Sequence, residues 1–256
     1  MDRKRGPLMS EYGLRDGECI WVENFAVEGE LVFEPHSHLK AQLVWADRGQ
    51  IAVIVAERRW ILAPSQALWI PAEEVHDIRT SDGTELFCAY LWEEECETGW
   101  EGLTVLSMSP LARELLRHLA REDLEDAAAR HARATLLSVL TPADAAGVDL
   151  PMPNDPRARA VASAVLEAPG ATHALDDWAR QLHASERTIQ RAFLSDTGLT
   201  FSAWRTQVRL CRSLALLADR VPVSSVAARM GYSSTNGFTS AFRRHFGTTP
   251  ANYFEG

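Results

Sequence analysis

The chain has 256 residues, of which 46% are hydrophobic and 24% are charged, and its formal net charge at pH 7 is −9. This composition suits one large domain or two small domains with real hydrophobic cores, and the acidic balance of the whole chain argues against nucleic acid as a partner. No apolar run approaches the roughly 18 residues of a membrane span, and no apolar run follows the basic residues near the start as in a signal peptide. The four cysteines form no CxxC pair, so nothing suggests a disulfide framework. We therefore expect a cytoplasmic protein with no membrane partner.

The N-terminal half begins with a polar arm and continues with β-type sequence. Residues 1–17 are polar and contain glycine, so we expect a loose arm. From residue 20 to about residue 92, short segments rich in β-branched and aromatic residues alternate with turn residues, which predicts an antiparallel sandwich or barrel. The clearest predicted strands are 50–56, 59–63, 67–70 and 85–92.

Histidines occur at two places in this predicted barrel. His36 and His38 are two residues apart, and Gln42 follows four residues later. His76 follows a proline by five residues. The pattern resembles the two motifs of the cupin superfamily, small β-barrels that often hold a metal or a small ligand. The sequence departs from these motifs twice, because Gln42 stands where the first usually has Glu, and Glu73 stands where the second usually has Gly.

The histidine pattern predicts a metal site. Alternate residues of a strand face the same side, so His36, His38 and Gln42 can all face the barrel interior. His76 would come from a neighbouring strand. Neutral imidazoles suit divalent Zn, Ni, Cu and Fe, and any of these would be the expected cofactor. The alternative is that these side chains only form hydrogen bonds inside a barrel that binds an organic effector, or nothing.

Residues 109–141 have a helical pattern. Ser109 can cap a helix that has Pro110 in its first turn, and an acidic turn separates two apolar stripes of leucines. A helical hairpin attached to a barrel predicts a homodimer surface, although it would also serve simply to cover one face of the barrel. Four prolines and one glycine in residues 142–156 predict an interdomain linker.

The C-terminal part contains the same helical pattern twice. In each copy, four apolar residues at spacing i, i+3, i+4, i+7 precede a short polar turn and a second amphipathic helix, as in a helix-turn-helix. Between the copies, residues 201–218 contain no Gly or Pro and predict one rigid helix about 27 Å long. This length would allow two recognition helices to enter successive major grooves. The two apolar sets are Leu175, Trp178, Ala179 and Leu182, and Val223, Val226, Ala227 and Met230.

This repeat resembles the DNA-binding domain of the AraC/XylS family of bacterial transcription regulators. The resemblance covers about a hundred C-terminal residues and implies double-stranded promoter DNA as a partner, and RNA polymerase as a further partner if the protein is an activator. Its most specific markers, in the order of the family, are Gly231-Tyr232-Ser233-Ser234, Phe238, Ala241-Phe242-Arg243-Arg244, Phe246-Gly247 and Pro250.

The charge distribution agrees with this resemblance. Residues 154–256 hold 12 arginines, no lysine and 8 acidic residues, a net charge of +4, whereas residues 1–153 hold 14 basic and 27 acidic residues, a net charge of −13. A basic half can bind phosphates, Arg can read guanine and Gln can read adenine, although some outward arginines would only be solvated. The predicted DNA-binding residues are Ser185, Glu186, Arg187, Gln190, Arg191, Ser234, Thr235, Asn236, Thr239, Ser240, Arg243 and Arg244.

The sequence therefore predicts an α+β chain in which a cupin-like antiparallel β-barrel with a helical hairpin precedes an all-α domain with two helix-turn-helix units. We expect a sequence-specific transcription regulator, activator or repressor, controlled by a metal ion or small-molecule effector in the barrel, and not an enzyme. Two alternatives stay open: a metal-dependent cupin enzyme fused to a DNA-binding domain, and an effector-independent regulator with a scaffold barrel. The expected divisions are residues 1–108 (barrel), 109–141 (hairpin), 142–156 (linker) and 157–256 (DNA-binding domain).

Overall fold

The computed structural model of the chain separates into two compact units. One comprises Met1–Ala56 and Leu62–Ala146, and the other comprises Glu57–Ile61 and Gly147–Gly256; we call them the N-terminal unit and the C-terminal unit. Most of the predicted arm, residues 1–17, lies outside the described residues. The structure describes residues 4–5, 20–29, 31–56, 58–92, 96, 98–100, 102–121, 123–143 and 149–253.

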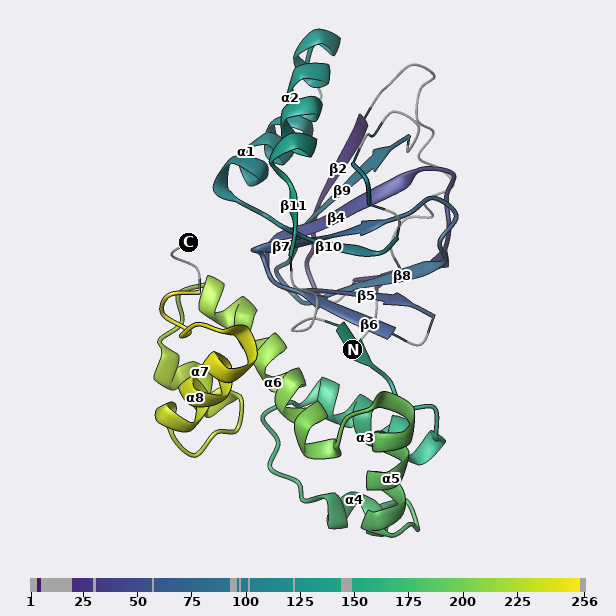
Figure 1. Cartoon of the computed structure of the whole chain (residues 1–256), viewed down its shortest axis with the longest axis vertical. Coiled ribbons are helices and arrows are strands. Elements are labelled where there is room, and N and C mark those ends of the chain that lie inside the picture. Colours follow the sequence, from purple (N-terminus) through teal and green to yellow (C-terminus); the bar gives the residue numbers. More distant parts are fainter. Residues whose placement is uncertain are drawn as a thin grey trace. The chain divides into compact units, whose positions relative to one another are not determined.

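Two sheets form the N-terminal unit (Figure 1). In the first sheet the strand order is β1 (Lys4–Arg5), β3 (Leu31–His36), β8 (His76–Thr80) and β5 (Ile51–Val55). In the second sheet it is β11 (Thr141–Pro142), β10 (Thr104–Ser107), β7 (Gln66–Ile70), β4 (Ala41–Arg48), β9 (Glu85–Leu91) and β2 (Ile20–Ala26). β1 runs parallel to β3, and the pairs β3–β8, β5–β8, β2–β9, β4–β9, β4–β7, β10–β7 and β10–β11 are antiparallel.

The second sheet is covered on both faces. Its inner face packs against the first sheet, where the rings of Phe25 and Phe33 are 5.6 Å apart. Its outer face carries large apolar side chains such as Trp45 and Trp69, which share one cluster with the helical hairpin. Burial on both faces explains why β4 and β7 read as nearly continuous apolar runs instead of alternating patterns. The expected antiparallel β architecture with attached helices is confirmed.

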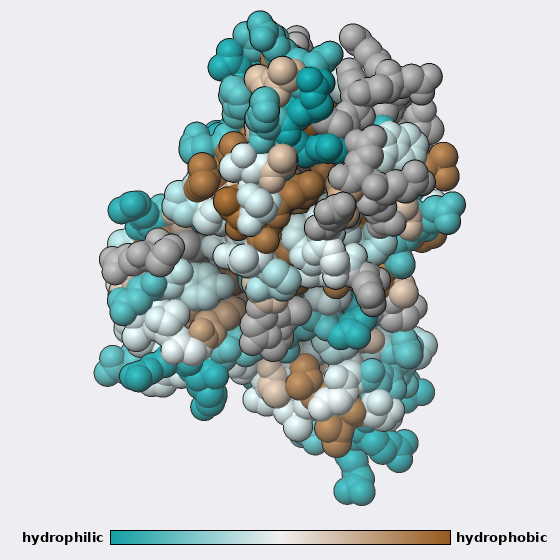
Figure 2. All heavy atoms as spheres, turned by 45° about the horizontal axis from the view of Figure 1, so that its top comes forward, coloured by the Kyte–Doolittle hydropathy of each residue, from teal (hydrophilic) through white to brown (hydrophobic). Residues whose placement is uncertain are grey.

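The hairpin consists of α1 (Pro110–Leu119) and α2 (Asp126–Val139). As predicted, Ser109 caps α1, because its hydroxyl accepts a hydrogen bond from the amide of Ala112 at 3.2 Å. Leu116 and Leu136 are fully buried against the second sheet, so the hairpin covers that face. The opposite surface of α2, at the top of Figure 2, is mainly hydrophilic, whereas Leu111 of α1 is 52% exposed.

The C-terminal unit is mainly helical. The helices are α3 (Pro156–Glu167), α4 (Leu175–Gln181), α5 (Glu186–Thr197), α6 (Phe201–Ala218), α7 (Val223–Arg229) and α8 (Thr235–Phe246). α6 lies between α3–α5 on one side and α7–α8 on the other (Figure 1). Two short strands, β6 (Arg58–Leu62) and β12 (Asp149–Pro151), pair antiparallel, so part of the predicted linker is ordered in this unit. No helix in the described part of the chain is long and apolar enough to cross a membrane.

The predicted internal repeat is visible in the packing. α4–α5 and α7–α8 form two helix-turn-helix units, and the small residues Ala179 and Ala227 are buried at equivalent points of the first helices. The recognition helices end in the same way, because Gly198 follows α5 and Gly247 follows α8, both in the left-handed conformation that favours glycine. α6 occupies the predicted range.

Candidate functional site

Three histidines meet at one end of the N-terminal unit. His36 ends β3 and pairs in register with His76, the first residue of β8. His38 lies in the turn through which the chain passes from the first sheet to β4 of the second. One ligand nitrogen from each ring lies within 4.8 Å of the other two. The predicted cluster therefore forms, but the predicted reason is wrong, because His38 lies in a turn and does not share a strand with His36.

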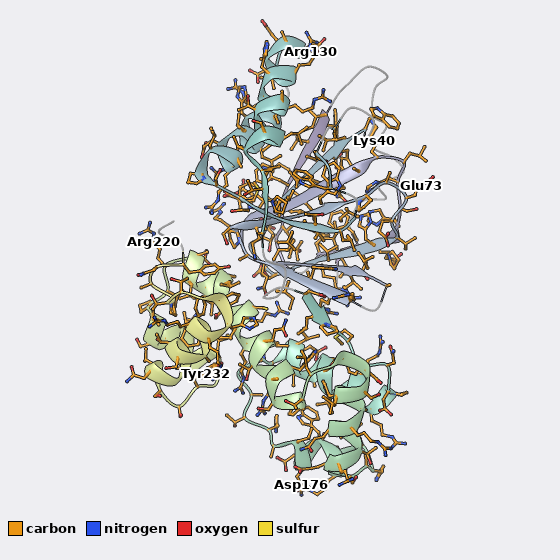
Figure 3. All side chains as sticks on the ribbon, viewed as in Figure 1. Lys40, Glu73, Arg130, Asp176, Arg220 and Tyr232 are labelled. Atoms are coloured by element: carbon orange, nitrogen blue, oxygen red, sulfur yellow. The ribbon has the colours of Figure 1, made fainter. Side chains whose placement is uncertain are left out.

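The surrounding turns hold this cluster in place. The amide of Glu73 donates to the carbonyl oxygen of His38 at 2.8 Å, which ties the turn before β8 to the turn before β4. Glu73 has φ +62°, a left-handed conformation that a glycine adopts without strain. This explains why the related motif usually has Gly here. Glu73 and Lys40, another residue of these turns, are labelled in Figure 3.

Main-chain carbonyls fix the tautomer of all three imidazoles. Each Nδ1 atom lies within hydrogen-bonding distance of a carbonyl oxygen two residues away. Because a carbonyl oxygen only accepts, each Nδ1 must carry the proton, and each Nε2 keeps its lone pair when the ring is neutral. The three bonds are His36 Nδ1 to Glu34 O (2.7 Å), His38 Nδ1 to Lys40 O (2.6 Å) and His76 Nδ1 to Glu74 O (2.8 Å).

The Nε2 atoms have the environment of metal ligands. Those of His36 and His76 are buried and have no hydrogen-bond partner among the described residues. The Nε2 of His38 lies 3.3 Å from Oε1 of Gln42. Gln42 donates with its own Nε2 to the hydroxyl of Tyr90 at 3.2 Å, so its oxygen is the atom that faces the cluster. Gln42 thus lies where the sequence predicted it.

The protonation state also suits metal binding. The pKa of His76 is lowered to about 4, mainly by burial and in smaller part by the nearby His36 and His38. Burial also lowers the pKa of His38. Neutral imidazole is the form that binds a metal ion, and buried histidines of low pKa stay neutral at physiological pH.

The donor set and its spacing fit one divalent transition metal. Zn–N bonds are about 2.0–2.1 Å long and the ligands are arranged tetrahedrally, so two nitrogens on one ion are about 3.4 Å apart. Nitrogens within 4.8 Å of one another would therefore close by up to about 1.4 Å to share an ion. Three imidazole nitrogens and an amide oxygen are ligands that Zn, Ni, Cu and Fe(II) accept.

Sequence reasoning missed two residues beside the cluster. The rings of Tyr90 and His38 are 5.2 Å apart, and Tyr90 lies opposite Gln42 in the β4–β9 register. Cys88 lies two residues earlier on the same face of β9, and burial raises the pKa of its thiol to about 12. Strand pairing is the signal that brings both residues next to Gln42, and the sequence alone does not specify it.

Glu23 was also missed. It lies opposite Cys88 in the β2–β9 register and is only 8% exposed. Neither carboxylate oxygen has a hydrogen-bond partner among the described residues. Burial raises the pKa of Glu23 more than the nearby indole of Trp21 lowers it. A buried carboxylate of this kind is costly, so it marks a place where a ligand could supply a hydrogen-bond donor.

The first recognition helix, α5, presents the predicted residues to solvent. Ser185 caps it by accepting a hydrogen bond from the amide of Thr188 at 3.1 Å. Ile189 and Phe193 are fully buried, which fixes the face that α5 turns inward. The exposed side chains on the other face are Glu186, Arg187, Gln190 and Arg191.

The second recognition helix, α8, is arranged in the same way. Ser234 caps it by accepting from the amide of Gly237 at 3.1 Å, and Phe238 and Phe242 are fully buried. A Cβ atom at position 237 would lie 3.2 Å from the Ser234 hydroxyl, which is a tight contact. Thr239 is half-buried, and the exposed predicted residues are Ser234, Thr235, Asn236, Ser240, Arg243 and Arg244.

Comparison with known proteins agrees with both parts of the chain. Residues 29–199 match the AraC-like ligand binding domain, and residues 178–256 match a helix-turn-helix domain. The HTH-type transcriptional regulator NimR of Escherichia coli is 32% identical over 227 residues, which cover 88% of this chain and 83% of NimR. The chain belongs to the AraC family of transcription regulators.

Two further proteins are similar to this chain. The HTH-type transcriptional regulator RipA of Corynebacterium glutamicum is 32% identical over 219 residues, which cover 84% of this chain and 62% of RipA. The solved structure of ToxT from Vibrio cholerae aligns with 92% of this chain and 97% of ToxT, with 12% identity and a TM-score of 0.38.

Membership of the AraC family decides between the broad functions that the sequence left open. The protein is a DNA-binding transcription regulator with a ligand-binding N-terminal domain, and the family comprises regulators and not enzymes. The alternative of a cupin enzyme fused to a DNA-binding domain is thereby removed.

Proposed function

We propose that His36, His38 and His76 bind one divalent transition metal in the N-terminal unit, with Oε1 of Gln42 as the fourth ligand. The single observation that carries this proposal is the convergence of the three rings: one ring nitrogen of each lies within 4.8 Å of the other two, and the buried Nε2 atoms of His36 and His76 have no hydrogen-bond partner among the described residues. The bound metal, or a small molecule that binds beside it, would control promoter binding or activation by the C-terminal unit.

The second candidate is an organic effector without a metal. Glu23 favours it, because its buried carboxylate has no partner among the described residues. An effector with a hydroxyl or amino group would satisfy these oxygens. A barrel that serves only as a scaffold would leave both Glu23 and the imidazole nitrogens without partners.

For DNA, we propose that the exposed faces of α5 and α8 contact one face of the operator. Arg187, Gln190 and Arg191 would reach base edges, and Arg243 and Arg244 would hold phosphates. The remaining predicted DNA-binding residues of both helices would add shorter polar contacts. Thr239 is half-buried, and all the other predicted DNA-binding residues are exposed.

We further propose the division into a barrel (residues 1–108), a hairpin (109–141), a linker (142–156) and a DNA-binding domain (157–256). The α1–α2 hairpin would form the surface of a homodimer, and RNA polymerase would be a partner if the protein activates transcription. A cytoplasmic location follows from DNA as the target.

The proposal is tested by metal analysis of the purified full-length chain. We expect one equivalent of metal that a chelator removes, and we expect His76→Ala to abolish its binding. DNA binding is then measured with and without metal on a duplex enriched by this protein from a random pool. An exposed histidine, His173, supplies the matched control as His173→Ala. If the wild-type protein takes up no added Zn, Ni, Cu or Fe(II), the proposed metal site is wrong, and the organic effector is the remaining candidate.

A further inference from the structure

The central helix α6 carries three arginines on one face. Arg205, Arg209 and Arg212 have the spacing i, i+4, i+7, so their side chains lie along one side of the helix. All three donate to main-chain carbonyls of the segment between residues 166 and 173, which comprises the end of α3 and the loop that leads to α4. The acceptors are His173 O for Arg205 (3.2 Å), Pro169 O and Ala171 O for Arg209 (2.8 and 3.0 Å), and Leu166 O for Arg212 (3.3 Å).

Arg209 also reaches the second helix-turn-helix unit. Its guanidinium carbon lies 5.9 Å from the ring centre of Tyr232, in the turn between α7 and α8. The same guanidinium binds Pro169 and Ala171, just before α4 of the first unit. One side chain therefore contacts both units.

The main chains of the two units touch at the same place. A Cβ atom at Gly170 would lie 2.1 Å from the carbonyl oxygen of Arg229, the last residue of α7. A Cβ atom at Gly231 would lie 2.5 Å from the carbonyl oxygen of Gly170 and 3.0 Å from a guanidinium nitrogen of Arg209. Such distances leave no room for a side chain at either position. We call this contact of residues 169–171 with residues 229–232, together with Arg209, the clasp.

The clasp joins segments that lie next to the helices proposed to contact DNA. Residues 169–171 lead into α4 of the first unit, and residues 229–232 comprise the last residue of α7 and the start of the turn that leads to α8. α6 connects the two units, and each unit packs against this helix; in the first unit the ring centres of Phe193 and Trp204 are 5.4 Å apart. The clasp adds a second attachment, formed by two hydrogen bonds, the stacking on Tyr232 and a main-chain contact that requires glycine.

We propose that Arg209 is a positioning residue for operator recognition, which fixes the relative position of the two helix-turn-helix units and so sets the spacing between the two DNA elements that the protein accepts. This inference rests on the proposed contact of both α5 and α8 with DNA. Arg209 itself does not contact DNA, since its guanidinium is used by the clasp.

The test measures how strongly binding depends on spacing. Duplexes enriched from a random pool by the full-length wild-type chain are remade with one to three base pairs added or removed between the two elements. Each base pair rotates one element by about 34° relative to the other, so we expect the wild type to lose at least about tenfold affinity at two base pairs. Arg209→Ala should bind the parent duplex roughly five- to tenfold more weakly and vary less than about threefold across the series.

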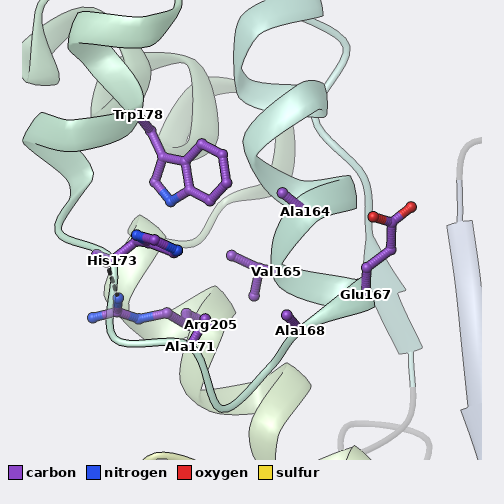
Figure 4. Close-up of a pocket in the computed structure, with 8 residues that line it drawn as sticks. All are labelled: Ala164, Val165, Glu167, Ala168, Ala171, His173, Trp178 and Arg205. Carbon is purple, nitrogen blue, oxygen red and sulfur yellow. Dashed lines mark hydrogen bonds between the residues drawn. The ribbon is translucent and has the colours of Figure 1, made fainter.

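Arg205→Ala is the matched control, because Arg205 binds His173 of the same segment (Figure 4) but takes no part in the clasp. Arg205 and His173, together with Trp178 and Val165, line a cavity of about 220 Å³ in the C-terminal unit. This variant should keep the wild-type spacing profile. An Arg209→Ala protein with the wild-type profile, or an Arg205→Ala protein with an equally flat one, would overturn the inference.

Gly170→Ala tests the clasp from the main-chain side and should also flatten the profile. Thermal melting by circular dichroism is measured for every variant. If both Arg209→Ala and Gly170→Ala fail to fold, the clasp is a folding element, and the positioning role is overturned. If the wild type enriches only a single DNA element, the proposed contact of both recognition helices fails and the inference fails with it. If two elements are enriched but Arg209→Ala keeps their spacing, only the inference fails.

Discussion

The Oε1 atom of Gln42 lies 3.3 Å from the Nε2 atom of His38. The proton of His38 is on Nδ1, which binds Lys40 O, and the amide nitrogen of Gln42 binds Tyr90. Two lone pairs therefore face each other inside the protein, and such a contact is unfavourable unless a proton or a cation lies between them. A metal ion bound to both atoms satisfies this requirement and also uses the Nε2 atoms of His36 and His76.

Gln42→Glu should strengthen metal binding. The substitution keeps the length of the side chain and replaces a neutral oxygen ligand with a charged one, so we expect the dissociation constant for Zn to fall by about tenfold or more. Competition with a chromophoric chelator measures it. Gln42→Leu removes the oxygen at similar volume and should weaken binding. Equal affinities of the wild type and both variants would place the fourth ligand elsewhere.

Glu23→Gln should stabilise the protein at neutral pH. Burial raises the pKa of Glu23 in the folded state above its value in the unfolded chain, so the ionised carboxylate opposes folding above the folded pKa. An amide removes this charge at nearly constant volume, and we expect about 1–2 kcal/mol of added stability from urea unfolding at pH 7.

The same comparison has a defined pH dependence. As the pH falls through the raised pKa of Glu23, the wild-type carboxyl becomes protonated in the folded protein, and the cost of its charge disappears. The advantage of Glu23→Gln should therefore shrink towards pH 4.5 and vanish below it. The exposed Glu28 is the control, and Glu28→Gln should change stability little at either pH. A Glu23→Gln advantage that is constant with pH would contradict this account.

The helical half could be predicted closely because its signals are local. The absence of Gly and Pro from residues 201–218 and the cap residue Thr200 define α6, and the side chain of Thr200 accepts from the amide of Ala203. Ser185 and Ser234 likewise mark the starts of α5 and α8. In each case the residues that determine the element lie within a few positions of it, and no distant contact is needed to interpret them.

The barrel site was predicted only in part, because it depends on contacts between distant strands. His36, His38 and His76 were found from their spacing, but Glu23 and Tyr90 enter through the register of β2 and β4 with β9. Nothing local to residue 23 indicates that it lies opposite residue 88. The role of Arg209 could not be predicted either, because the sequence of a helix shows only that an arginine is solvated or binds phosphate until its main-chain partners are known.

A fragment of residues 149–256 should be more stable than one of residues 154–256. The fully buried indole of Trp204 donates to the carbonyl oxygen of Pro151 at 2.8 Å, and Gln207 donates to that of Asp149 at 2.8 Å. Starting at residue 154 removes both acceptors and leaves the indole nitrogen without its partner, at a cost of about 1–3 kcal/mol. We expect the melting temperature to be lower by roughly 4 °C or more. Equal melting temperatures would show that β12 does not stabilise the helices.

Arg187→Ala and Arg191→Ala should each weaken operator binding by about 1–3 kcal/mol if the arginine reads a base. Both side chains are exposed on the face of α5 opposite the buried Ile189 and Phe193, so neither substitution removes a core contact. Fluorescence anisotropy with the enriched duplex, measured at several salt concentrations, gives the affinity. A base contact lowers affinity and relaxes the preferred sequence, whereas a phosphate contact weakens all duplexes equally and reduces the salt dependence.

The control for this pair is Arg180→Ala. Arg180 is also exposed, but it lies on α4 and forms ion pairs with Asp176 and Asp177 of the same helix. Exposed pairs of this kind contribute little stability, so the variant should fold and should bind the operator nearly as well as the wild type. If Arg180→Ala weakens binding as much as Arg187→Ala and Arg191→Ala do, the loss reflects general charge on the first helix-turn-helix unit. If neither α5 variant changes affinity, the first recognition helix does not enter the groove with this face.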